Sequence, residues 1–228
     1  MITLENYIWS FTINTKTELV IFDLDGTLCD SFNDIYLSLK HTLDIYNVFT
    51  PSLPEVKSFV GDGLLKLIER TLNVSNQIHL LDDIMKSFMD YYKIHCTDST
   101  LLFPGMDNVI ISLYNQNIKM AVVSNKAENL VKIIINHLNL SKYFQYVFGG
   151  DSFSEKKPSP LPLNYILENL KINPQNSIIV GDSDNDVIAG SNAHMRTCFC
   201  TFGYSALYKS SSDYTINSPI ELLNIIKG

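Results

Sequence analysis

The sequence predicts an α/β protein in which a parallel sheet carries helices on both faces and a helical cap is inserted into the chain. Three short apolar runs, at residues 19–22, 120–123 and 178–180, indicate strands buried on both sides. Helical patterns separate the later runs, and this alternation is typical of parallel sheets. Polar residues follow each run at once. Because such sheets bind ligands at the carboxyl ends of their strands, we expect the functional site at that edge.

Residues 31–100 differ from the rest, because their apolar residues keep helical spacing throughout and no strand signal interrupts them. Three apolar stripes are suited to packing helix against helix. Their members are Phe32, Ile35, Tyr36, Leu39 and Leu43; Leu64, Leu65, Ile68 and Leu72; and Leu81, Ile84, Met85, Phe88 and Tyr92. Pro104 and Gly105 mark the return to the core. We therefore expect a discontinuous Rossmann-like core over residues 1–30 and 101–228, with a helical cap over residues 31–100.

Size and charge narrow the classes of function. The chain has 228 residues, 46% of them hydrophobic, which is enough for a sizeable core. Its net charge of -7 excludes a sequence-independent grip on nucleic acid or on an anionic membrane. The four cysteines lack metal-type spacing, and residues 1–17 lack the basic start and long apolar run of a signal peptide or anchor. We expect a soluble cytoplasmic protein with reduced cysteines and no nucleic-acid or membrane partner.

Two carboxylates, Asp23 and Asp25, stand two residues apart directly after the first apolar run. Residues two apart on a strand share a face, and Gly26 lets the chain turn so that both acids reach one site. Close carboxylates repel each other, and a divalent cation with oxygen ligands relieves that repulsion. Alone, the pair also fits a strand end with an acidic turn, and Thr27 fits either a site residue or a structural turn.

Three further polar clusters follow in order, and each also has a structural explanation. Ser124 and Asn125 precede a helix, where unpaired N–H groups bind anions, although Ser124 also fits a simple N-cap. Lys157 stands before a proline, as solvated lysines commonly do. Asp182 and Asp186 are four residues apart in a turn after the third run, so both face one point if a helix begins there. Asp186 also fits the stabilisation of that helix's first turn. The conjunction of four ordered clusters favours one functional site.

These four clusters resemble the motifs of the haloacid dehalogenase superfamily over residues 19–228. The resemblance implies that Asp23 is a nucleophile, Asp25 a general acid and base, and Lys157 a stabiliser of charge. It implies phosphate or substrate contacts from Thr27, Ser124 and Asn125. It also implies an Mg²⁺ cofactor, whose ligands are Asp23, Asp182 and the main-chain carbonyl of Asp25, with Asp186 supporting the metal or Lys157.

Within that superfamily, the segment Val60-Gly61-Asp62-Gly63 and several shorter segments resemble phosphoglycolate phosphatases. The resemblance implies hydrolysis of a small phosphate monoester, 2-phosphoglycolate, through an aspartyl-phosphate. Backbone N–H groups of Gly61 to Gly63 would meet the substrate carboxylate, and Arg70 would add charge, although a glycine-flanked helix cap also explains the loop. The alternatives are a pyrophosphatase, a nucleotide or sugar-phosphate phosphatase, or a non-catalytic phosphate-binding module.

Overall fold

A computed structural model of the chain describes residues 16–205 and 210–227, and its centre is a six-stranded parallel sheet. The strand order is β5-β4-β1-β6-β7-β8. The strands are β1 (Leu19–Phe22), β4 (Lys119–Val123), β5 (Tyr146–Phe148), β6 (Ser177–Gly181), β7 (Arg196–Cys200) and β8 (Tyr214–Ile216). The three predicted apolar runs are the adjacent central strands β1, β4 and β6. Their central position explains why their sequences are apolar on both faces.

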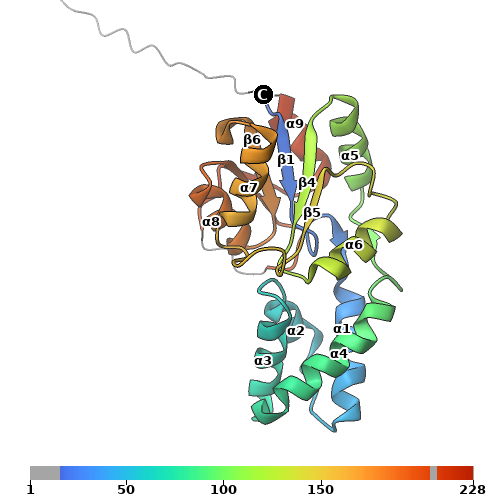
Figure 1. Cartoon of the computed structure of the whole chain (residues 1–228). Helices are drawn as coiled ribbons and strands as arrows, with labels where there is room; N and C mark the ends of the chain where they lie inside the picture. The colour runs from blue at the N-terminus through green and yellow to red at the C-terminus, as the bar shows by residue number, and fades with distance from the viewer. Residues whose placement is uncertain (1–15, 206–209, 228) are drawn as a thin grey trace, which may run out of the picture.

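Helices cover both faces of the sheet, which confirms the predicted fold class (Figure 1). The helices of this part are α5 (Met106–Asn115), α6 (Glu128–His137), α7 (Leu161–Leu170), α8 (Asp184–Asn192) and α9 (Leu222–Lys227). Val20 and Phe22 of β1 pack in one apolar cluster with α5, α6 and α9. Leu19 and Ile21 point to the other face and pack with α7 and α8. This alternation follows from the two-residue period of a strand.

The inserted region is helical, as predicted. It comprises α1 (Phe32–Ile45), α2 (Leu53–Phe59), α3 (Leu64–Val74) and α4 (Leu81–His95), with a short 3-10 helix at Ile78–Leu80. These helices lie together at one end of the sheet (Figure 1). The chain enters and leaves them through a two-stranded antiparallel pair, β2 (Cys29–Asp30) with β3 (Leu101–Leu102). That residues 31–100 form a separate domain from the core remains a prediction.

A buried carboxylate holds the two connections together. Asp34, in the first turn of α1, is 2% exposed. It accepts hydrogen bonds from the backbone N–H and the hydroxyl of both Ser99 and Thr100. The start and the end of the helical region are therefore joined by charge-assisted hydrogen bonds.

The cysteines and the lengths of the helices also bear on the sequence-based expectations. The four cysteines are free thiols and all are buried. None of the described helices combines the length and the apolar character that a membrane crossing requires. The expectation about residues 1–17 falls almost entirely outside the described residues.

Candidate active site

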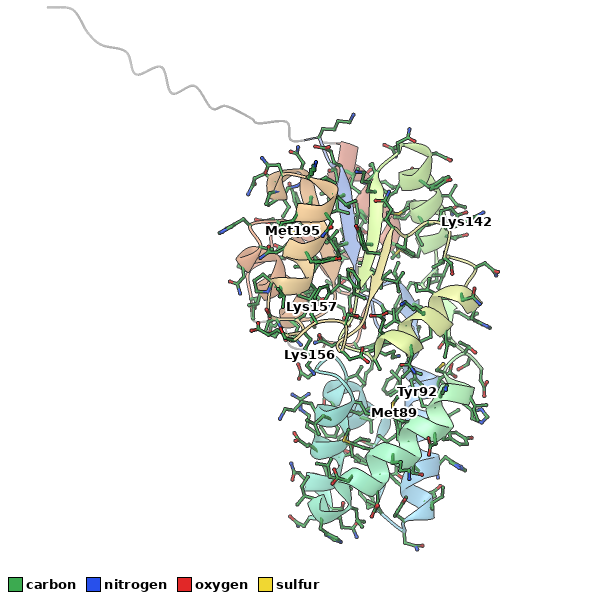
Figure 2. The ribbon with its side chains drawn as sticks, viewed as in Figure 1. Met89, Tyr92, Lys142, Lys156, Lys157 and Met195 are labelled. Atoms are coloured by element: carbon green, nitrogen blue, oxygen red, sulfur yellow. The ribbon has the colours of Figure 1, made fainter. Side chains whose placement is uncertain are left out.

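The carboxyl ends of β1, β4 and β6 bring the predicted polar clusters together. These strands are neighbours and run parallel, so the residues that follow them meet at one edge of the sheet. Asp23 follows β1, Ser124 follows β4, and Asp182 follows β6. Lys157 reaches the same place from the loop before α7, and it lies at the end of the sheet nearest the inserted helices (Figure 2).

Three buried carboxylates share one buried ammonium at this edge. Asp23, Asp182 and Asp186 each offer an oxygen within 4.8 Å of the others. Lys157 Nζ lies 2.9 Å from Asp23 Oδ1 and 2.5 Å from Asp186 Oδ1. All four residues are buried, and Lys157 is 3% exposed. The cluster therefore holds more negative than positive charge when its carboxylates are ionised.

The pKa values reflect this imbalance. Burial raises the pKa of Asp23 from 3.8 to about 7, because attraction to Lys157 offsets the loss of hydration only in part and Asp186 adds repulsion. Burial, followed by repulsion from Asp23 and Asp186, also raises the pKa of Asp182 well above its usual range. For Lys157 burial lowers the pKa, but attraction to Asp186 and Asp23 outweighs it and the pKa is raised. Lys157 therefore stays charged, and its single positive charge does not balance the negative charges of the three carboxylates.

The unused oxygens suit a hard cation. Among the hydrogen bonds of the described residues, Asp23 Oδ2 and Asp182 Oδ1 accept none. Asp186 is different, because one oxygen accepts from Lys157 and the other from the N–H and hydroxyl of Ser183 at the start of α8. Carboxylate oxygens in excess of protein donors are the ligands that Mg²⁺ prefers. The donor set thus fits a divalent cation between Asp23 and Asp182, with Asp186 committed to Lys157.

Two glycines leave room for the Asp182 side chain. Gly26 has φ of +83°, and a Cβ there would lie 2.2 Å from Asp182 Oδ2. A Cβ on Gly203 would lie 2.2 Å from the Asp182 Cβ. On its remaining side, Asp182 Oδ2 accepts the backbone N–H of Tyr204 at 2.5 Å. A larger residue at either glycine would therefore displace this carboxylate.

Asp25 is not a member of the acidic cluster and has a cation of its own. Its Oδ1 accepts from Lys126 Nζ at 2.6 Å and from the Ser31 hydroxyl. Lys126 Nζ also donates to the Tyr92 hydroxyl of α4 at 2.7 Å. Burial lowers the pKa of Lys126, but attraction to Asp25 and Tyr92 outweighs it, so the pKa is raised. Sequence reasoning missed this lysine, although it directly follows Ser124 and Asn125.

The remaining predicted phosphate contacts lie in different surroundings. Ser124 is buried, and its hydroxyl accepts the backbone N–H of Lys126 at 3.2 Å. Both amide hydrogens of Asn125 are used, on the carbonyls of Gly61 and Lys157 at 3.0 Å each. Thr27 is fully buried, and its hydroxyl has no partner among the described residues. Asn125 therefore joins two loops in this structure, and its side-chain amide is not free to donate to a ligand.

The loop from Gly61 to Gly63 is tied to the sheet edge. Asn185 of α8 donates to Asp62 Oδ1 at 2.6 Å, and Lys156 donates to the Asp62 carbonyl at 2.7 Å. Arg70 pairs with the other oxygen of Asp62. Gly63 has φ of +87°, which favours glycine, and a Cβ there would lie 3.0 Å from the carbonyl oxygen of Asn125. The loop is thus fixed against the strand ends.

A cavity of about 300 Å³ lies between the sheet edge and the inserted helices. Its polar wall comprises Asp23, Asp25, Ser124, Asn125, Lys126 and Tyr92. Its apolar wall includes Ile35, Leu67, Met85, Phe88, Met89 and Leu130. Gly61 and Gly63 also line it, whereas Thr27, Lys157 and Arg70 do not. A small molecule in this cavity would contact Asp23 and Asp25 together.

Comparisons with known proteins agree with this geometry. The family model for haloacid dehalogenase-like hydrolases matches residues 20–200. The chain is 35% identical to the phosphoglycolate phosphatase of Aquifex aeolicus, over 91% of this chain and 96% of that protein. It is 37% identical to the phosphoglycolate phosphatase of Neisseria meningitidis, over 86% and 85%. A crystal structure described as a predicted phosphoglycolate phosphatase from Haemophilus somnus matches with a TM-score of 0.86 and 28% identity, over 93% and 99%. The chain therefore belongs to the haloacid dehalogenase-like hydrolase family.

Proposed function

We propose that the protein is an Mg²⁺-dependent phosphatase that hydrolyses a small phosphate monoester, 2-phosphoglycolate, through an aspartyl-phosphate on Asp23. The observation that carries this proposal is that Asp23 belongs to two features of the site at once. Its carboxylate belongs to the acidic cluster with Lys157, and the same residue lines the cavity. The names of the relatives from Aquifex aeolicus and Neisseria meningitidis support the choice of substrate.

In the first step an Asp23 oxygen attacks phosphorus in line with the ester bond, which breaks as the new bond forms. Lys157 holds Asp23 Oδ1 in a hydrogen bond and so orients the carboxylate. The Ser124 hydroxyl and the backbone N–H groups of Leu24 and Asn125 follow the strand ends and would donate to the phosphoryl oxygens. Neither N–H donates to a described backbone oxygen. Such preorganised donors stabilise the charge of the transition state.

Asp25 would move the protons in both steps. It lines the cavity beside Asp23, and its Oδ2 accepts no hydrogen bond from a described residue. In the acid form it gives a proton to the leaving alcohol oxygen. As a carboxylate it then takes a proton from a water whose oxygen attacks phosphorus, while the bond between phosphorus and Asp23 breaks and releases phosphate and the Asp23 carboxylate. Lys126 and Ser31 hold its Oδ1 and fix its direction.

Asp23, Asp182 and the main-chain carbonyl of Asp25 would hold Mg²⁺, which supplies positive charge to the phosphoryl group and neutralises the cluster. Asp186 supports Lys157 in this arrangement. Residues 31–100 would act as the cap, because Gly61 and Tyr92 contact the sheet-edge residues Asn125 and Lys126. The cap would shield the cavity from bulk water and leave room for the one water that reacts. The acidic net charge of the chain supports an enzyme without nucleic-acid partners.

The apolar wall favours a second candidate within the same reaction class. Side chains such as Phe88, Met89 and Leu130 would contact an aryl or alkyl leaving group. They offer few polar partners to pyrophosphate or to sugar phosphates. The second candidate is therefore hydrolysis of a phosphate monoester with an apolar alcohol.

A substrate panel tests both candidates. Phosphate release would be measured from 2-phosphoglycolate, phenyl phosphate, pyrophosphate and a sugar phosphate, each with Mg²⁺ and with a chelator. We expect the highest kcat/KM with 2-phosphoglycolate and no turnover with the chelator. A higher kcat/KM with phenyl phosphate would replace the first candidate by the second. Turnover of none of the four would contradict the phosphatase proposal itself.

A further inference from the structure

The cavity contains one cation that the reaction steps do not use on the phosphoryl group. Among the described residues that line it, Lys126 is the only lysine, arginine or histidine. The other candidate cations are committed elsewhere: Lys156 to the Asp62 carbonyl and Arg70 to the Asp62 carboxylate. Neither of these two lines the cavity. An anionic group on a leaving alcohol would therefore meet Lys126.

Lys126 and Tyr92 each have a donor to spare. An ammonium has three N–H donors, and Lys126 uses two, on Asp25 Oδ1 at 2.6 Å and on the Tyr92 hydroxyl at 2.7 Å. The Tyr92 hydroxyl accepts that bond and keeps its own proton to donate. Neither spare donor has an acceptor among the described residues. Both side chains line the cavity, and both are almost fully buried.

We infer that Lys126 and Tyr92 form the receptor for the carboxylate of the substrate, which makes them determinants of specificity for an acidic leaving group. This inference rests on the proposed function. Two neighbouring donors, one charged and one neutral, match the two oxygens of a carboxylate.

The position of Lys126 fits the length of 2-phosphoglycolate. One methylene separates the carboxylate of this molecule from the ester oxygen. The group that protonates the ester oxygen and the group that binds the carboxylate must therefore be neighbours. Asp25 and Lys126 are in direct contact.

The surroundings of the pair make it selective. Phe88 of α4 and Leu130 of α6 belong to the apolar wall of the same cavity. A carboxylate in such a place is costly unless it is paired, whereas a charge-assisted hydrogen bond there is stronger than in water. The Gly61 to Gly63 loop, which the sequence suggested as the receptor, offers only neutral N–H groups.

The test compares 2-phosphoglycolate with phenyl phosphate, which carries the same reacting group and no carboxylate. The Lys126→Met variant should lower kcat/KM for 2-phosphoglycolate about 100-fold more than for phenyl phosphate, mainly through KM. Tyr92→Phe should lower the same ratio about 10-fold, and Lys126→Arg should retain most of it. Lys132→Met, at an exposed position of the neighbouring helix α6, should leave the ratio unchanged.

Equal losses on both substrates would overturn the inference, because Lys126 would then act only through Asp25. Inhibition of the wild-type enzyme gives a second measurement that does not depend on the folding of a variant. Glycolate should compete with phenyl phosphate, and ethanol, which lacks the carboxylate, should not. Equal inhibition by the two would also overturn the inference. A wild-type enzyme that hydrolyses phenyl phosphate but not 2-phosphoglycolate would instead show that the proposed substrate is wrong. The proposed carboxylate receptor would then be wrong as well.

Discussion

Asp34 and the three residues of the acidic cluster all have buried carboxylates, yet they differ in the number of hydrogen-bond donors around them. The Asp34 carboxylate accepts two N–H and two hydroxyl donors from Ser99 and Thr100. Asp23 and Asp186 share a single ammonium, Asp182 accepts one backbone N–H, and two oxygens of the three carboxylates accept nothing from the described residues. A carboxylate with a full set of neutral donors stabilises a fold by itself. A cluster with too few donors is arranged for a cation and a substrate.

The largest effect should come from Asp23→Asn. Turnover of any phosphate ester should fall by about 10⁴-fold or more, because the amide is not a nucleophile. Thermal stability should be retained or increased, since the change removes a negative charge from a cluster with excess negative charge. Phosphate release and thermal unfolding measure the two effects. Asp107→Asn, an exposed change in the first turn of α5, serves as the control; it should leave turnover unchanged and lower the free energy of unfolding by no more than about 1 kcal/mol, its contribution to the helix N-terminus. Wild-type turnover in Asp23→Asn would remove the nucleophile from the mechanism.

Asp34→Ala should show the opposite pattern. The variant takes the acceptor from the N–H groups of Ser99 and Thr100 and from the Ser99 hydroxyl, whereas the Thr100 hydroxyl keeps the Cys96 carbonyl, so the free energy of unfolding should fall by about 3 kcal/mol. The folded fraction should keep its kcat, because Asp34 does not line the cavity. Denaturant unfolding measures the loss. Asp44→Ala on the same helix removes an exposed pair with Lys40 and should cost less than about 0.5 kcal/mol. Equal losses for the two variants would show that the Asp34 hydrogen bonds do not stabilise the fold.

The acidic cluster could be predicted from the sequence, whereas the donors around Asp34 could not, and the same difference applies to the strands. Strands β1, β4 and β6 were predictable because both of their faces are buried, so their residues are apolar without interruption. The edge strand β8 was not, since two of its three residues are exposed and its pairing with β7 defines it. The donors around Asp34 lie 65 residues away, beyond any local pattern.

Within the site, the strand ends could be predicted and the contacts between regions could not. Asp23, Ser124 and Asp182 each follow an apolar run, so their common edge follows from a parallel sheet. Tyr92 belongs to an apolar helical stripe in the sequence, and nothing local indicates that its hydroxyl meets Lys126. The spacing suggested Asn125 as a phosphate contact, but the packed loops use both of its amide hydrogens. These contacts depend on how the helices sit against the sheet.

A divalent cation should stabilise the protein through the acidic cluster and not through Asp34, and this effect is smaller than the two above. Mg²⁺ at 100 times its dissociation constant should stabilise the folded protein by about 2.7 kcal/mol, because it binds the native cluster and not the unfolded chain. Thermal unfolding with increasing Mg²⁺ measures this shift. Asp182→Asn should abolish it, whereas Asp34→Ala should lower the starting stability and keep the shift. An equal Mg²⁺ shift in wild type and Asp182→Asn would place the cation elsewhere.

The smallest effect concerns pH in the metal-free protein. The pKa of Asp23 is raised from 3.8 to about 7 in the folded state, so the folded state binds more protons than the unfolded chain between these values. The stability linked to Asp23 is therefore complete below pH 3.8 and decreases as the pH rises to about 7. Between pH 5.5 and pH 8 this change is about 2 kcal/mol, so the Tm should fall by roughly 4–8 °C more in wild type than in Asp23→Asn, with a chelator present. Parallel Tm profiles for the two proteins would show that the charge of Asp23 is already compensated without a cation, and the cluster would then resemble Asp34.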